Sequence, residues 1–152
     1  MYTRGISLPE IIIVIAIISI IATIVTASFS GLRNTQILGS AVETVKAIIA
    51  DARSKTLSSK DDSPYGVHFA TSSVTIFKGI LYTDGAPDNL VTTLHENVSM
   101  TDVTLAGGGS DLVFSRLTGE VAAYGSVTLD IISGSTTART ISVSPAGVIS
   151  GE

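Results

Sequence analysis

The chain begins with a long, almost uniformly apolar stretch. The range 11–27 contains few polar residues, namely Ser19, Thr23 and Thr26. A helix of about seventeen residues covers roughly 25 Å at about 1.5 Å per residue, close to the roughly 30 Å of a bilayer's hydrocarbon core. The flanking residues, from Glu10 to Phe29, close the remaining gap. The pattern therefore predicts a membrane-spanning helix.

After Gly31 the pattern becomes that of an amphipathic helix. Apolar residues now recur at spacings of three and four: Leu38, Ala41, Val42, Val45, Ile48, Ile49 and Ala52. This spacing places them on one buried face. We expect one helix from about Leu8 to about Leu57, ended by a polar, turn-forming segment that closes at Pro64.

From Tyr65 onward the apolar residues alternate with polar ones, which is typical of strands. The runs 67–69 and 74–76 predict a hairpin. Further strand candidates are 98–105, 112–114, 120–123, 127–131, 140–143 and 147–149. Glycine-containing turns separate them. We expect a mostly antiparallel sheet packed on the helix, which is an α+β fold.

Three interpretations of the first thirty residues compete. The first is a secretory signal peptide with Arg4 as its charged region, cut near 26–28. The second is a plain membrane anchor, and the third is a precursor cut before the apolar run. Glu10 bears on the choice, because a carboxylate drawn unpaired into lipid costs several kcal/mol. Taken alone, however, Glu10 is also compatible with a solvated position at the headgroup boundary.

The segment 4–10, Arg-Gly-Ile-Ser-Leu-Pro-Glu, followed directly by the apolar run, resembles the class III signal of type IV prepilins and pseudopilins. That signal has a short basic leader ending in glycine, an apolar residue, a small hydroxyl residue, leucine, a variable position and glutamate. The resemblance implies that prepilin peptidase cleaves between Gly5 and Ile6 and that the new Ile6 amine is N-methylated. Ile6 stands where Phe or Met is commoner. Pro9 falls in the first helical turn, where proline is tolerated.

The same resemblance implies a role for Glu10 in assembly. Pilin helices pack side by side in an apolar filament core, where a buried carboxylate needs a cation. The Ile6 amine of a neighbouring subunit can supply it and set the axial register. The implied organisation is a removed leader (1–5), a transmembrane and filament-core helix (6–30), an amphipathic half (31–60) and a C-terminal β-domain (61–152).

The strand region carries a second resemblance. The order of strand residues and glycines resembles the C-terminal pattern of GspH/FimT-type minor pseudopilins. The residues that carry the resemblance are 113–114 with Gly119, then 127–129, and then 141–144 with 147–149. This implies a minor, non-enzymatic structural subunit of a type IV pilus-like filament or of the type II secretion pseudopilus.

That family implies partners and a location. The partners are prepilin peptidase, other pilin or pseudopilin subunits and the inner-membrane assembly machinery. The location is a single-pass position in the cytoplasmic (inner) membrane with the C-terminal domain outside the cytoplasm, and afterwards the pilus or pseudopilus. The alternative is an exported or membrane-anchored β-domain that serves as a binding module or enzyme and forms no filament.

Candidate ligand-binding residues are few. Asp84, Asp88 and Asn89 offer three oxygen side chains in one loop, the ligand type that calcium prefers, although an exposed turn explains the same residues better. His68 is expected on the surface of a strand, and His95 in a loop, neither with a ligand at metal spacing. We expect no metal, no cofactor and no catalytic site.

Charge argues against a nucleic-acid partner. The 152 residues carry a net charge of −4, with 13 acidic and 9 basic residues. Basic residues beyond the helix are scattered, namely Lys60, Lys78, Arg116 and Arg139. Clustered cations are what attract a polyanion, so we do not expect DNA binding, although some FimT-like pilins of competence filaments bind DNA. The chain has no cysteine, which excludes disulfides and thiolate metal sites.

Overall fold

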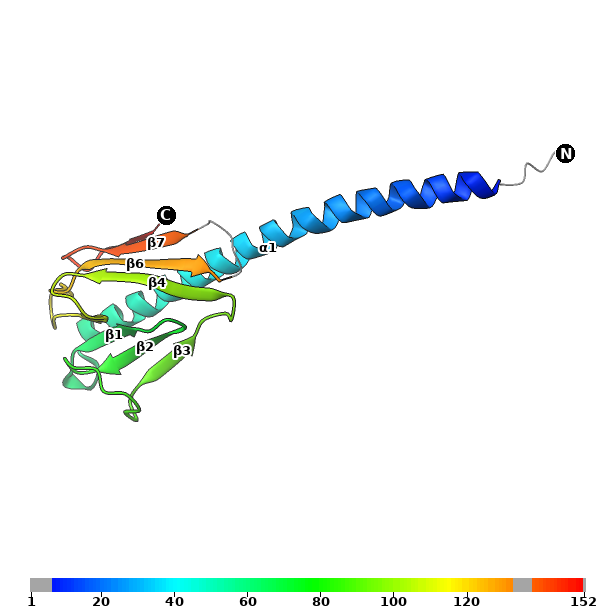
Figure 1. Cartoon of the computed structure of the whole chain (residues 1–152). Helices are drawn as coiled ribbons and strands as arrows, with labels where there is room; N and C mark the ends of the chain where they lie inside the picture. Colours follow the sequence, from blue (N-terminus) through cyan, green and yellow to red (C-terminus); the bar gives the residue numbers. More distant parts are fainter. Residues whose placement is uncertain (1–6, 133–137, 152) are drawn as a thin grey trace. The chain divides into compact units, whose positions relative to one another are not determined.

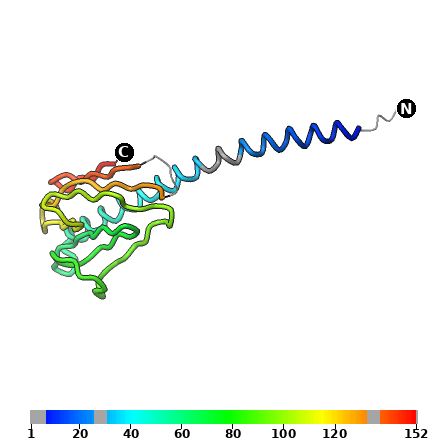
Figure 2. Tube along the Cα trace, viewed as in Figure 1, coloured from blue at the N-terminus to red at the C-terminus, as the bar shows by residue number. Residues whose placement is uncertain are grey.

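The computed structural model describes residues 7–132 and 138–151, without the side chains of residues 26–30. Helix α1 runs from Leu8 to Leu57, as the sequence predicts. Figures 1 and 2 trace this helix in blue and cyan, and the strands in green to red. The contacts divide the chain into two compact units, Met1–Asn34 and Thr35–Glu152.

The second unit holds the end of α1, a short 3₁₀ helix and the strands. The 3₁₀ helix η1 spans Lys60–Asp62. The strands are β1 (Tyr65–Phe69), β2 (Ser73–Lys78), β3 (Leu90–Thr93), β4 (Val98–Leu105), β5 (Asp111–Val113), β6 (Gly125–Ile131), β7 (Arg139–Val143) and β8 (Ile149–Gly151).

The strands form two antiparallel sheets where the sequence suggested one. The first sheet has the order β3-β2-β1-β5 and the second the order β4-β6-β7-β8. The hairpin β1–β2 is confirmed, with Val67 opposite Ile76. The other strand pairs of the described residues are antiparallel as well. The α+β class is therefore confirmed, with the β-structure split into two sheets.

Two details of the strand prediction were wrong. Residues 120–123 form no strand, and only Val121 makes an isolated bridge, to Phe114. The reason is a turn in which the Ser115 amide donates to the Glu120 carbonyl and Gly119 has φ 67°. Strand β3 was missed because its two apolar residues, Leu90 and Val91, are both exposed and do not alternate.

Strand β4 explains a change of phase in the sequence. Its register against β6 shifts between Met100 and Asp102. An extra residue of this kind moves the alternation by one position. The apolar pairs Val98/Met100 and Val103/Leu105 therefore follow different phases within a single strand.

One face of the second half of α1 is covered by the strands. The buried apolar helix residues are Leu38, Ala41, Val42, Val45, Ile49 and Ala52, and they belong to one cluster with residues of β1, β2, β4, β5, β6 and β7. Ile48 is partly buried against the same cluster. The periodicity of the sequence thus predicts this packing face correctly.

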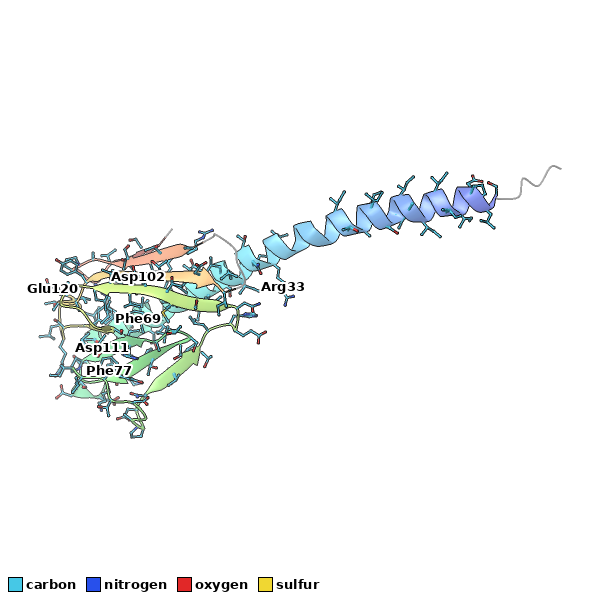
Figure 3. All side chains as sticks on the ribbon, in the orientation of Figure 1. Arg33, Phe69, Phe77, Asp102, Asp111 and Glu120 are labelled. Atoms are coloured by element: carbon cyan, nitrogen blue, oxygen red, sulfur yellow. The ribbon has the colours of Figure 1, made fainter. Side chains whose placement is uncertain are left out.

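The first sheet is also covered on its other face. Phe77 is buried but does not belong to the main core. A Cβ added to Gly66 would lie 2.4 Å from Phe77 Cζ, so the ring crosses the strand where glycine leaves room. The Phe77 ring also meets the Tyr82 ring edge-on, with centroids 5.6 Å apart. Through Tyr82, the loop after β2 therefore covers part of this face. Figure 3 labels Phe77 and, from the neighbouring strand β5, Asp111.

Candidate functional site

Glu10 lies in the first turn of α1, where it acts as part of a helix cap. Its Oε2 accepts a hydrogen bond from the Ser7 amide at 3.4 Å. The Ser7 carbonyl in turn accepts from the amides of Glu10 and Ile11. Ser-x-x-Glu before an apolar run is the capping-box sequence, and an acid here also complements the helix dipole. The Ser-x-x-Glu spacing at 7–10 signals this local role in the sequence, beside the predicted role of Glu10 in assembly.

The helix that follows Glu10 is not covered by other side chains among the described residues of its unit. The range Leu8–Val25 is long and apolar enough to cross a membrane, and none of it is buried. Its two described hydroxyl residues bond to their own helix: Ser19 Oγ donates to the Ile15 carbonyl and Thr23 Oγ1 to the Ser19 carbonyl, each at 2.8 Å. These bonds satisfy hydroxyl donors that an apolar environment would otherwise leave unpaired.

The cleavage site expected between Gly5 and Ile6 lies outside the described residues. The first described residue, Ser7, follows it directly. Of the three residues expected to act in processing and assembly, Glu10 lies among the described residues. The assignment of Gly5 and Ile6 stays a prediction.

The candidate calcium loop is held by its own hydrogen bonds. Asp84 Oδ1 accepts from the Tyr82 hydroxyl at 3.1 Å, and Asn89 Nδ2 donates to the Thr83 carbonyl at 2.8 Å. Asp88 lines a pocket with Lys60 and Lys78. In residues 7–132 and 138–151, no three His, Cys, Asp or Glu side chains gather at a distance suited to a metal ion.

The expectation that His68 is a surface residue was wrong. Its side chain is only 24% exposed, and its Nδ1 lies 2.6 Å from Asp111 Oδ1. The ring stacks on Tyr82 with centroids 3.9 Å apart. His68 points away from the main core, as its place in the strand predicts, but the loop after β2 covers it. His95 lies between β3 and β4, exposed, with its Nδ1 accepting from the Asn97 amide.

Tyr82 belongs both to this cluster with His68 and Asp111 and to the loop after β2. Burial, with the hydrogen bond to Asp84 adding to it, raises the pKa of the Tyr82 hydroxyl. A neutral phenol stacked on the imidazole holds the loop on the first sheet. Nothing in the sequence signals that Asp111 would meet His68, because 43 residues separate them. The geometry of this cluster is that of a structural contact, which holds the loop after β2 on the first sheet.

No protein-family model and no curated protein sequence matches this chain. Among solved structures, two crystal forms of the type IV minor pilin FimU from Pseudomonas aeruginosa (strain PAO1) are similar to it. The TM-score is 0.57 for both, at 19% and 18% sequence identity. The match covers 76% of this chain and 92% and 87% of the FimU chains. The chain therefore has a type IV pilin-like fold.

Proposed function

We propose that this chain is a non-enzymatic, minor subunit of a type IV pilus-like filament or of a type II secretion pseudopilus. The observation that carries the proposal is the first half of α1. It is an exposed apolar helix that starts with a carboxylate and continues into the amphipathic half. The pilin-like fold of the chain supports the same function.

In this proposal the protein is first a membrane-inserted precursor and then a filament subunit. As a precursor it lies in the inner membrane through 8–25, with the domain beyond Thr35 outside the cytoplasm. Prepilin peptidase cuts between Gly5 and Ile6, and the new amine is N-methylated. The assembly machinery then extracts the helix into a filament, where lipid is replaced by the helices of other subunits.

Glu10 serves both stages in this proposal. In the membrane its carboxylate caps its own helix through the Ser7 amide. That bond is long and uses one of the several acceptor positions that a carboxylate offers. The remaining positions can pair with the Ile6 amine of a neighbouring subunit, which offsets the desolvation of both charges.

The test is the identity of the mature N-terminus. The full chain is produced in cells that contain a prepilin peptidase, and its intact mass and N-terminal peptide are measured. We expect a chain that begins at methylated Ile6, and an uncut chain for Gly5→Val. Thr26→Leu, which alters the competing signal-peptidase region, is the matched control and should be processed normally.

Other results would contradict the proposal. A chain that begins after Thr26, or cleavage that survives Gly5→Val, indicates an exported β-domain with a conventional signal peptide. An uncut wild-type chain indicates a membrane anchor. Both results remove the filament mechanism and favour a binding module or enzyme.

A further inference from the structure

A groove of about 760 Å³ lies beside the last turns of α1, within the unit Thr35–Glu152. Its apolar lining includes Ala50, Leu57, Val148 and Ile149. Val148 is 60% exposed and Leu57 39% exposed. Arg53 is the charged side chain among the groove's lining residues. An exposed apolar surface around one charge is typical of a recognition site.

Two loops hold the Arg53 side chain in place. Its Nε donates to the Gly119 carbonyl and its Nη2 to the Ala146 carbonyl, each at 3.4 Å. A Cβ added to Gly147 would lie 2.2 Å from the Gly119 carbonyl oxygen and 2.9 Å from Arg53 Nε, and one added to Gly119 would lie 3.1 Å from Arg53 Nε. Both glycines have positive φ, 71° and 67°. The two loops therefore pack closely on each other and on the guanidinium.

The charge of Arg53 has no acidic partner in the described part of the chain. The ion pairs there join Lys46 to Glu43, Lys55 to Asp51, His68 to Asp111 and Arg116 to Asp62. The two bonds of Arg53 use two of the five N–H groups of a guanidinium, and both acceptors are neutral carbonyls. A carboxylate is the group that best complements a guanidinium fixed in this way.

The turn that leads to Gly119 contains Leu117, which has a strained backbone conformation and an exposed apolar side chain. Leu117 has φ 70° and is 82% exposed. A branched, apolar residue in the left-handed region is an outlier, and such conformations concentrate at functional sites. Leu117 precedes Gly119 by two residues, so the loop that fixes Arg53 also carries this exposed side chain.

We propose that this groove, defined by Ala50, Arg53, Leu57, Val148 and Ile149, docks a neighbouring filament subunit through a segment that carries an apolar side chain and one carboxylate. The carboxylate pairs with Arg53, and the apolar side chain covers Leu57 and Val148. This docking rests on the proposed filament function. It adds a second contact between subunits to the one that Glu10 makes.

The test is site-specific photo-crosslinking of the full chain in cells that assemble filaments. The photo-reactive amino acid p-benzoylphenylalanine replaces Val148, or Val91 as the control with the same 60% exposure. Sheared filaments are analysed by immunoblot, and adducts are mapped by mass spectrometry. We expect Val148 to cross-link to an Asp- or Glu-containing segment of another pilin subunit, and Arg53→Gln to reduce this adduct about tenfold or more.

A charge exchange separates recognition from a merely structural role of Arg53. Arg53→Glu should abolish the adduct, and replacing the mapped partner acid with arginine should restore it. A structural role alone predicts no rescue. The docking proposal is overturned if the chain is in filaments but Val148 gives no adduct with another subunit, if Arg53→Gln leaves the adduct unchanged, or if the exchange does not restore it. Absence of the wild-type chain from filaments overturns the filament function and the docking together.

Discussion

The two halves of α1 differ in where their apolar side chains find cover. In Leu8–Val25 nothing is buried. In the second half Val45, Ile49 and Ala52 have no exposed surface. Both stretches are rich in apolar residues, but only the second has a polar face opposite the apolar one. A uniformly apolar helix has no preferred side to pack on a sheet, so under the proposed function we expect its cover to come from lipid and then from other subunits.

The same contrast holds for polar groups. The second half carries ion pairs at helical spacing, Lys46–Glu43 and Lys55–Asp51. In Leu8–Val25 the charged side chain is Glu10, at the start. Variants in the first half should therefore affect assembly, and variants in the second half and in the strands it packs on should affect stability.

The largest effect is expected for Glu10→Ala in filament assembly. Removing one partner of a buried ion pair costs about 3–5 kcal/mol, so the amount of this chain in sheared filaments should fall by well over tenfold. Cleavage should remain normal, because Glu10 lies beyond the cut site. Immunoblots of filaments and membranes measure both. Glu43→Ala is the control, and normal assembly of Glu10→Ala would refute the proposed pairing with Ile6.

The second prediction compares two isoleucines of the same helix. Ile49 has no exposed surface, whereas Ile17 is 53% exposed. Ile49→Ala should lower the free energy of unfolding by about 2–5 kcal/mol, because it leaves a cavity in the core. Ile17→Ala should change it by less than about 0.5 kcal/mol. Denaturant unfolding of the full chain in detergent, followed by near-UV circular dichroism, measures both. Equal losses would contradict the division of the helix.

The length and burial of α1 could be predicted because its signals are local and repeated. The same is true of most strands, which alternate over five or more residues. The division into two sheets could not be predicted, because the pairing of strands is decided by contacts between residues far apart in sequence. Strand β5 joins β1 through pairs such as Val67 with Leu112, and no pattern near either strand specifies this choice.

The candidate sites likewise include one that could be predicted from local sequence and one that could not. Glu10 could be identified because its spacing from Gly5 and the apolar run is a short, contiguous signal. The groove could not be predicted, since Arg53 meets carbonyls 66 and 93 residues away. Gly119 and Gly147 belong to a family-like sequence pattern, but the close contact of their two loops with each other and with Arg53 depends on the folded chain.

The third prediction compares two glycines. At Gly66 an added Cβ would lie 2.4 Å from Phe77 Cζ, whereas at Gly39 it would meet nothing within 4 Å. Gly66→Ala should therefore cost about 1–3 kcal/mol of stability through overpacking. Gly39→Ala should add about 0.5–1 kcal/mol through helix preference. Thermal unfolding gives both values. Phe77→Leu should recover part of the Gly66→Ala loss; if it does not, the clash is not the cause.

The smallest effect at neutral pH is expected at Tyr65, and it concerns the domain alone. The Tyr65 hydroxyl donates to Asp61 Oδ2 at 2.7 Å. Burial, together with this bond, raises the pKa of Tyr65 to about 12, and the same bond lowers the pKa of Asp61. At pH 7, Tyr65→Phe should lose about 0.5–1.5 kcal/mol, the usual value of one hydrogen bond.

Alkaline pH makes the contribution of Tyr65 visible. The unfolded chain releases a tyrosine proton near pH 10, while folded Tyr65 holds its proton to about pH 12. The stabilisation is therefore fully present below about pH 10 and is lost as the pH rises from there toward about 12. Tyr65→Phe should show a shallower fall of stability over this range. Equal alkaline slopes for the wild-type protein and Tyr65→Phe would show that Tyr65 is not the group responsible.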